Sequence, residues 1–430
     1  MKLDLRTNDE QPLSRKIAHQ SRKAVTFKGG RDRLAHRWYR LTPSYSPELV
    51  TNVLDEFGSA NTKVLDPFSG RGTTPIECQL RGIPCIGVEI NPMLHFAGKV
   101  SLNWSVSSSR FLSLLDNIET QALSIKAKYQ GKNSLYIADA MDIAYPQIHN
   151  VNRWWRDDVL ADLLILKGTI SRVSMSNAER QLFSLNLANI IVDVANITLG
   201  RLQLHFIDRG DEVIDSFLHF RNSCEEVVAD LAELNAFDVC EETSIILGDS
   251  TQLSKLINGY EPNLVITSPP YPNRYSYVWN TRPHLYFMDF FTTPREAGTL
   301  DAETIGGTWG TATSRHMKGE FSYTDDTSKR IISGIVDEIR EKDLLMSNYV
   351  AMYFDDLYRH ILELNKCINS GTVCAYVVGN SRIKKSIVET DLILNDLFNA
   401  CGYDSIRIEE IRRRNSGKEL HETTVFVERK

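Results

Sequence analysis

The sequence predicts an α/β protein with a doubly wound, mostly parallel sheet and a large, mainly helical insertion. Short apolar runs, such as residues 85–90, 263–266 and 372–378, alternate with segments of helical periodicity. Residues 104–242 differ, because their apolar residues recur at i, i+3 and i+4 with few strand signals. Strands that alternate with helices on both sides indicate a parallel sheet covered by helices on its two faces.

Residues 1–33 form a polar, positively biased N-terminal arm. This arm either contacts phosphates or is a solvated tail, and both interpretations are open. Further on, Ser46 precedes Pro47 and Glu48, which is the pattern of a helix start with a capping serine and a proline in the first turn. A helix over Glu48–Phe57 is expected to lead into the first strand.

A glycine-rich turn, Asp66–Thr74, follows that strand and leads into a helical segment. The next apolar run, Cys85–Ile90, carries the acid Glu89. This order is the nucleotide-binding βαβ layout, in which glycines let the backbone approach the ligand and the acid takes ribose hydroxyls. The turn has no P-loop lysine, and Pro75 replaces the third glycine of a dinucleotide site. The unit therefore suits a nucleoside without a pyrophosphate, although Glu89 could instead be a surface acid.

The helical insertion, residues 104–242, contains four long stretches with helical spacing. They are Ser109–Lys128, Val159–Ser171, Ala178–Gly200 and Asp211–Leu234. Trp154 and Trp155 precede the second stretch and could contact a nucleic acid, but packing in the core is the favoured interpretation. Inserted domains on a catalytic sheet usually hold substrate, so a recognition role is predicted for the insertion.

The sheet is expected to resume at residues 244–250, a strand that ends in Gly-Asp-Ser, and to continue with the apolar run 263–266. Thr267–Tyr271 then ends the strand, because two consecutive prolines lack the N–H groups that a sheet ladder needs. The result is a stiff corner that suits a planar group. Backbone carbonyls and Ser268 can accept hydrogen bonds from an amino group, and Tyr271 can stack on a ring. An ordinary strand-to-loop turn is the alternative interpretation.

The rest of the chain adds a loop and helix insertion, residues 272–345, and the last elements of the sheet. Within the insertion, residues 304–329 are rich in Gly, Thr and polar residues and predict a mobile loop. The elements expected after it are a helix at Leu344–Leu364, a strand at 372–380, a helix at Val388–Ala400, and strands at Tyr403–Ile411 and Thr423–Glu428.

The composition is that of an ordinary globular protein, with 42% hydrophobic and 24% charged residues in 430. A net charge of −6 does not indicate a generally basic surface, so binding of nucleic acid would depend on local patches. The seven cysteines form no CxxC pair, which fits reduced thiols in a cytoplasm. Cys85 lies within an apolar run and is expected to be buried rather than nucleophilic. The sequence has neither an apolar signal core nor an uninterrupted 18-residue apolar run, so it does not predict a membrane segment.

The glycine-rich turn and the Thr267–Tyr271 stretch together resemble the S-adenosylmethionine-dependent DNA amino-methyltransferases, which methylate cytosine N4 or adenine N6. The resemblance covers residues 34–103 and 243–430 and implies that these form a catalytic domain with a seven-stranded methyltransferase sheet. The cofactor motif precedes the catalytic motif, and the spelling Ser-Pro-Pro-Tyr is more typical of cytosine-N4 members. That arrangement normally carries target recognition after the last strand, where this sequence has none, so the two insertions or another subunit must supply it.

The resemblance also implies the site residues. The residues expected to bind S-adenosylmethionine in the nucleotide-binding unit and at the end of strand 244–250 are Asp66, Phe68, Gly70, Gly72, Thr73, Glu89 and Asp249. A segment that closes over the methionine end of the cofactor is expected to contain Thr42, Pro43 and Tyr45, with aromatic packing as the alternative for this segment. The catalytic residues are Ser268, Pro269, Pro270 and Tyr271, and the loop lining the base pocket contains Asn273, Arg274 and Tyr275.

The function that follows from the resemblance is methyl transfer to the N4 amine of a cytosine flipped out of double-stranded DNA, in a restriction-modification system. A cognate restriction endonuclease is then a candidate partner, and no metal is required, since the sequence has no HExxH motif or Cys/His cluster. Adenine-N6 methylation and methylation of an RNA amine are alternatives. A non-catalytic recognition subunit is a third reading, but an intact Ser-Pro-Pro-Tyr argues against it.

Overall fold

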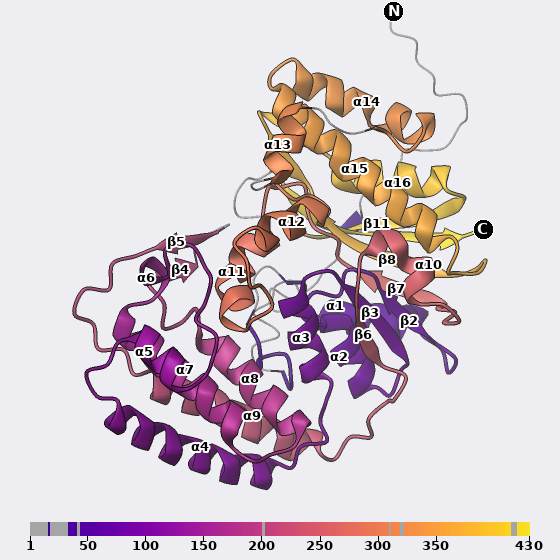
Figure 1. Ribbon diagram of the computed structural model, residues 1–430. Helices are drawn as coiled ribbons and strands as arrows, with labels where there is room; N and C mark the ends of the chain where they lie inside the picture. Colours follow the sequence, from indigo (N-terminus) through magenta and orange to yellow (C-terminus); the bar gives the residue numbers. More distant parts are fainter. Residues whose placement is uncertain are drawn as a thin grey trace, which may run out of the picture.

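The computed structural model describes residues 16–17, 33–40, 44–199, 203–308, 311–318, 322–413 and 419–430. Within these ranges, one sheet has eight strands in the order β1-β11-β12-β8-β7-β2-β3-β6 (Figure 1). Its strands are β1 (Lys16–Ile17), β2 (Val64–Asp66), β3 (Cys85–Glu89), β6 (Ser244–Leu247), β7 (Leu264–Thr267), β8 (Val373–Gly379), β11 (Tyr403–Arg413) and β12 (His421–Arg429).

The doubly wound, mostly parallel sheet predicted from the sequence is confirmed. β2 pairs in parallel with β3 and β7, β3 pairs in parallel with β6, and β7 with β8. Only β12 runs against its neighbours, between β8 and β11. Seven of the strands make up the expected sheet, and β1 joins β11 in parallel as an eighth strand at the edge.

Helices cover both faces of the sheet because the buried strands are apolar on both sides. Val64 and Ile266 pack with α1, whereas Leu65 and Val265 pack with α15 on the other face. The helices associated with the first face are α1 (Pro47–Phe57), α2 (Thr73–Leu80) and α3 (Pro92–Ser101). Those on the second face are α10 (Leu253–Leu256), which follows the short helix η2 (Ser250–Gln252), α14 (Asp326–Arg340), α15 (Leu344–Leu364) and α16 (Thr390–Ala400).

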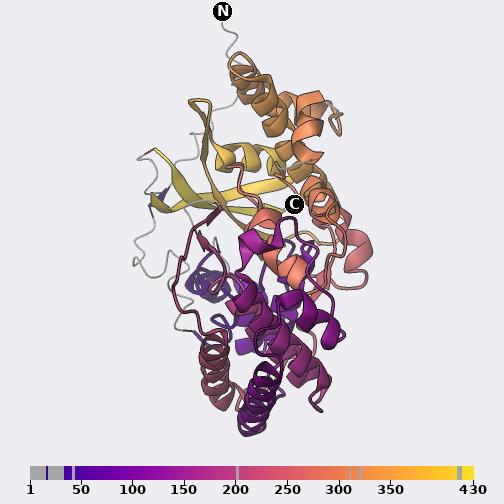
Figure 2. The ribbon, with the colours of Figure 1, turned by 60° about the vertical axis from the view of Figure 1, so that its left-hand side comes forward.

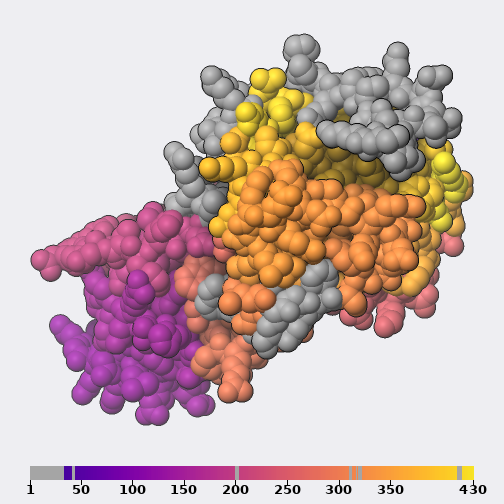
Figure 3. Space-filling model, turned by 90° about the horizontal axis from the view of Figure 1, so that it is seen from above, coloured from indigo at the N-terminus to yellow at the C-terminus, as the bar shows by residue number. Residues whose placement is uncertain are grey.

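The helical insertion forms a separate lobe beside the sheet, seen at the lower left of Figure 1 and at the lower left of the space-filling view in Figure 3. Its elements are α4 (Ser108–Lys128), α5 (Ser134–Ala140), α6 (Val151–Trp154), α7 (Asp157–Arg172), α8 (Asn177–Ile190), β4 (Ile197–Leu199), β5 (Leu204–Phe206) and α9 (Ser216–Leu234). Trp154 and Trp155 are buried, so the interpretation that they pack in the core is confirmed.

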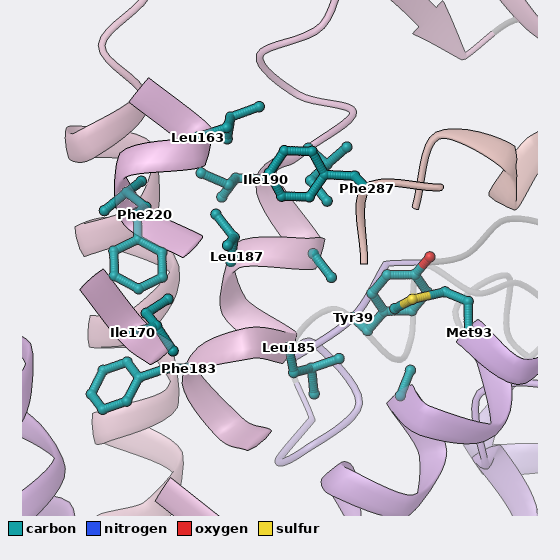
Figure 4. Close-up of a cluster of buried hydrophobic side chains, with 14 of the residues drawn as sticks. Tyr39, Met93, Leu163, Ile170, Phe183, Leu185, Leu187, Ile190, Phe220 and Phe287 are labelled. Atoms are coloured by element: carbon teal, nitrogen blue, oxygen red, sulfur yellow. The ribbon is translucent and has the colours of Figure 1, made fainter. Parts of the chain in front are cut away.

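The cores of the two lobes are continuous. Leu187 and Ile190 of α8 lie in one apolar cluster with Phe287 of α11 (Tyr277–Phe287) and with Tyr39 and Met93 on the sheet side (Figure 4). The turned view of Figure 2 likewise shows the helical lobe lying against the helices that flank the sheet. The insertion is therefore packed onto the lobe that contains the sheet rather than tethered to it by a linker.

Two helix boundaries predicted from the sequence were wrong. The stretch Ala178–Gly200 is not one helix: α8 ends at Ile190, and the chain turns into the hairpin of β4 and β5. The helix does not continue, because the Ile191 carbonyl accepts a hydrogen bond from the indole of Trp155 at 2.9 Å. Val388 ends β10 (Ser386–Val388), which pairs with β9 (Ser381–Ile383), so α16 begins only at Thr390.

The predicted mobile loop at residues 304–329 is partly helical. It contains α13 (Thr311–Lys318) and the start of α14, and α12 (Glu296–Glu303) ends just before it. α14 begins where it does because Asp325 caps it, accepting from the backbone N–H groups of Thr327 and Ser328 at 2.8 and 3.0 Å.

Segment 33–40 ties the two lobes together through buried charges. Asp230 of α9 is fully buried and accepts from the backbone N–H of Ala35 at 3.1 Å, from the indole of Trp38 at 2.8 Å and from the guanidinium of Arg37. On the sheet side, His36 lies 2.9 Å from the carboxylate of Glu77 in α2. A fully buried carboxylate needs such donors, because burial without them is costly.

Replacing Asp230 by alanine is expected to destabilise the protein by roughly 3 kcal/mol, because three donors lose their acceptor in a buried place. Urea unfolding followed by circular dichroism measures the change. The control is Glu226→Ala in the same helix, whose pair with Arg40 is 3.4 Å long and largely exposed, and it should change stability by no more than about 0.5 kcal/mol. Equal effects of the two substitutions would contradict this account.

Candidate functional site

A pocket opens at the edge where the parallel strands end. It holds about 1240 Å³ of empty space, part of it open to solvent. In open α/β sheets, ligands bind at the carboxyl ends of the strands, where neighbouring loops diverge. The residues that line this pocket include Tyr45, Phe68, Gly70, Glu89, Ile90, Asn91, Leu94, Asp249, Ser268, Pro270, Tyr271, Tyr277, Val377, Arg412 and Glu422.

The glycine-rich turn shapes one wall of the pocket. Gly70 lines the pocket with a φ of +55°, a conformation that favours glycine. Gly72 does not line the pocket but caps α2 with a φ of +92°, and a Cβ there would lie 3.3 Å from the Cα of Gly98 in α3. Gly72 therefore serves the close packing of α2 on α3, whereas Gly70 serves the pocket itself.

Glu89 is the charged group at the end of β3. Its carboxylate accepts from the backbone N–H groups of Gly70 and Asn91, each at 2.7 Å, and it lines the pocket. Burial raises the pKa of Glu89 to about 7, although both backbone hydrogen bonds oppose the shift. Each carboxylate oxygen still has a lone pair, so Glu89 can accept further hydrogen bonds from a ligand.

Asp66 holds the loops together from behind the pocket. It is fully buried and accepts from the hydroxyl of Tyr45 at 2.9 Å, from Thr267 at 2.6 Å and from the backbone N–H of Phe68 at 3.2 Å. Burial raises the pKa of Asp66 to about 6 against the effect of these bonds. Asp66 is not among the lining residues, but its partners Tyr45 and Phe68 are.

The other cofactor residues predicted from the sequence lie in different places. Asp249 lines the pocket at the end of β6 and accepts from the backbone N–H of Thr251 at 2.8 Å. Thr73 is buried in the first turn of α2, where its hydroxyl lies 3.3 Å from that of Ser44, and it does not line the pocket. Thr42 and Pro43 lie outside the described residues.

The Ser268–Tyr271 corner forms the opposite wall. The hydroxyl of Ser268 donates to the backbone carbonyl of Val377 in β8 at 3.0 Å, and the carbonyl of Pro270 accepts from the hydroxyl of Tyr353 at 2.7 Å. Pro269 is buried, while Ser268, Pro270 and Tyr271 line the pocket. The corner is thus fixed from two sides, by β8 and by α15.

The next loop does not enter the pocket. The side chain of Asn273 accepts from the backbone N–H of Tyr275 at 3.0 Å, and Tyr275 is buried against Tyr277, with ring centroids 4.8 Å apart. Arg274 is exposed and has a φ of +60°. None of the three predicted base-pocket residues lines the pocket; Tyr277 does so instead.

Sequence reasoning missed several lining residues that come from distant parts of the chain. Among them is an ion pair between Arg412 and Glu422, which lie on the neighbouring strands β11 and β12. Neither residue stands in a recognisable motif, and only the pairing of β11 with β12 and β8 brings them to the pocket. Cys85, in contrast, is buried in β3, and burial raises the pKa of its thiol, which fits the expectation that it is no nucleophile.

No family model matches the chain. Over nearly its whole length the chain is similar to Type II methyltransferases: 24% identical to M.BsoBI of Geobacillus stearothermophilus, over 93% of this chain and 85% of the relative. Identity to M.MvaI of Kocuria varians is 20%, over 90% and 86%. Identity to M.AvaI of Nostoc sp. is 22%, over 97% and 87%.

Among solved structures, TrmN from Thermus thermophilus matches with a TM-score of 0.32 at 7% identity, covering 93% of this chain and 53% of TrmN. The rRNA methyltransferase aviRa from Streptomyces viridochromogenes matches with a TM-score of 0.30 at 11% identity, covering 90% and 86%. These two likenesses are too weak to inform the site. The sequence relatives and the sheet itself define a methyltransferase whose methyl donor is S-adenosylmethionine.

The pocket fits this cofactor. Two acids, Glu89 and Asp249, stand at neighbouring strand ends and can accept from hydroxyl and amino groups, while Phe68, Ile90 and Leu94 offer apolar surface for a ring.

Among the described residues, no group of His, Cys, Asp and Glu could hold a metal ion. Within the same ranges, no helix has the length and apolar character needed to cross a membrane.

Glu89 is expected to make cofactor binding depend on pH. Because the pKa of Glu89 is about 7, lowering the pH from 8 to 6 protonates its carboxylate, and a carboxylate is the better acceptor for hydroxyl groups. The Kd for S-adenosylmethionine should therefore rise about tenfold between pH 8 and pH 6. Isothermal titration calorimetry measures it, and Glu89→Gln should bind more weakly and without this dependence. A wild-type Kd that stays constant would refute this role.

Proposed function

We propose that the protein is the DNA methyltransferase of a restriction-modification system and that it methylates the exocyclic N4 amine of cytosine. The similarity to Type II methyltransferases over most of the chain supports the class of substrate. The observation that carries the choice of an exocyclic amine is the position of Ser268. Ser268 lines the same pocket as Gly70 and Glu89, and its hydroxyl proton is already used on the Val377 carbonyl.

The hydrogen bond from Ser268 to Val377 determines which groups the corner can recognise. With its hydrogen on Val377, the Ser268 oxygen offers only lone pairs to a ligand. An amino group, which has two hydrogens to donate, suits such an acceptor, together with the Pro269 carbonyl. A carbonyl group on the substrate does not. Tyr271, at the end of the corner, offers an aromatic face on which a base ring can stack.

The residues of the corner would activate the amine by orientation and charge. The lone pair of the N4 amine is delocalised into the ring, and acceptors for both amino hydrogens favour a pyramidal nitrogen with an available lone pair. The same acceptors stabilise the positive charge that develops on nitrogen. S-adenosylmethionine supplies an electrophilic methyl group, and holding the amine in line with it provides much of the acceleration.

A cytosine inside a duplex cannot reach a corner at this depth, so the base is flipped out of the helix. The helical insertion and residues 272–345 would then hold the DNA. Arg274 lies on the loop between Tyr271 and Tyr277, which both line the pocket, and its exposed side chain can pair with a phosphate. A cognate restriction endonuclease is the expected partner in the cell.

The product identifies the function. The protein is incubated with S-adenosylmethionine and unmethylated genomic DNA, and the digested nucleosides are analysed by mass spectrometry. We expect N4-methylcytosine. Formation of N6-methyladenine would support methylation of an exocyclic amine in DNA but refute the choice of cytosine, since the same corner can hold either amine. No methylated nucleoside from DNA, together with methylation of RNA, would refute the substrate.

Replacing Ser268 by alanine should lower the single-turnover rate of DNA methylation by roughly 100- to 1,000-fold, because one preorganised acceptor for the reacting amine is lost. The Kd for S-adenosylmethionine should change less than twofold. The matched control is Ser333→Ala, which removes a hydroxyl that donates to the Arg330 carbonyl of the same helix at 3.0 Å and should leave the rate unchanged. A Ser268→Ala protein with the wild-type rate would show that the corner is not the catalytic site.

Tyr353 is expected to act as a positioning residue for the corner. Its buried hydroxyl donates to the Pro270 carbonyl, so Tyr353→Phe should loosen the corner and lower the methylation rate about tenfold. The loss should appear in kcat and leave the Kd for S-adenosylmethionine unchanged. Tyr136→Phe, at a half-exposed tyrosine of the insertion, serves as the control. An equal fall in both variants would point to a general effect on stability.

A further inference from the structure

An ion pair stands at the end of the pocket that holds the corner. Arg412 of β11 and Glu422 of β12 are register neighbours, and the guanidinium donates to both carboxylate oxygens, from Nε at 2.5 Å and from Nη2 at 2.7 Å. Both side chains line the pocket together with Ser268 and Tyr271. Such a two-bond pair holds the guanidinium plane in one orientation.

The order of the strands places this pair on the side of the corner that faces β12. Ser268 donates to Val377 of β8, and the next strand of the sheet, β12, carries Glu422 opposite Gly379, with Arg412 opposite Glu422 on β11. A pyrimidine whose amine is bound at Ser268 would then have its far edge on the side of β12, toward Arg412. Tyr271 and Arg412 line the same pocket, which agrees with this placement.

Arg412 has donors to spare for that edge. Its pair with Glu422 uses Nε and Nη2, and no other acceptor of Arg412 appears in the part of the chain that the structure describes. The remaining hydrogens on Nη1 and Nη2 can therefore serve a ligand. Next to its amine, cytosine carries two acceptors, N3 and O2. Adenine carries only N1 in the equivalent position, followed by a C–H group.

We propose that Arg412 is a specificity-determining residue that donates hydrogen bonds to N3 and O2 of the flipped cytosine, and that Glu422 is the residue that positions it. This inference rests on the proposed cytosine methylation and adds the groups that choose the base. Adenine at the same place leaves one guanidinium donor without an acceptor in a confined site. A site built to hydrogen-bond one polar atom strongly disfavours an analogue that lacks it.

The test compares the two bases in the same site. The wild-type product is first mapped on genomic DNA, and duplex oligonucleotides with cytosine or adenine at the mapped position are then methylated under single-turnover conditions. The variants are Arg412→Met and Glu422→Gln. The control is Arg413→Met, which removes the adjacent arginine, two-thirds exposed and paired with Glu410 outside the pocket. Cofactor affinity and thermal unfolding are recorded for each protein.

We expect Arg412→Met to lower the rate on cytosine roughly 10- to 100-fold and to lower the ratio of cytosine to adenine rates at least tenfold. Glu422→Gln should shift the ratio in the same direction, and Arg413→Met should change neither value. If the rates on both bases fall equally, or if neither falls, the pair only joins β11 to β12 and the inference is overturned. A wild-type protein that forms no N4-methylcytosine overturns the proposed function, and this inference with it, before any variant is made.

Discussion

The rest of the site depends on the hydrogen bonds of one buried carboxylate, that of Asp66. Its hydrogen bonds join Tyr45, which precedes α1, to the turn after β2 and to Thr267 at the end of β7. The wall formed by the glycine-rich turn and the wall formed by the Ser268–Tyr271 corner thus meet at one charged group from which solvent is excluded. Such a group is costly to bury, and its donors have to stay in place for the fold to tolerate it. The same bonds therefore fix both walls.

The sequence was a good guide where a local pattern had one physical solution. The apolar runs at 85–90 and 263–266 could only be buried strands, and the double proline could only end one. Prediction failed where distant contacts decide the outcome. α8 stops at Ile190 because its next carbonyl is bound to Trp155, a contact with no signature in the periodicity of the helix.

The candidate site divides along the same line. Gly70, Glu89 and Asp249 stand at strand ends that a βαβ pattern reveals, and they line the pocket. Arg412 and Glu422 could not be found in this way, because they belong to strands whose order in the sheet puts β12 between β8 and β11. Asp66, which the motif suggested as a ligand-binding residue, instead supports the residues that face the ligand.

The shared core has a consequence for engineering. Apolar contacts run without a break from α7 and α8 to Tyr39, Met93 and Phe287, and the Asp230 carboxylate adds a polar tie across the same boundary (Figure 4). Cutting the chain at residues 104 and 242 would expose this apolar surface on both halves. The helical insertion is thus no interchangeable cassette. A chimera with a relative would have to carry segment 33–40 and α11 along with the insertion, so that the two packing surfaces still match.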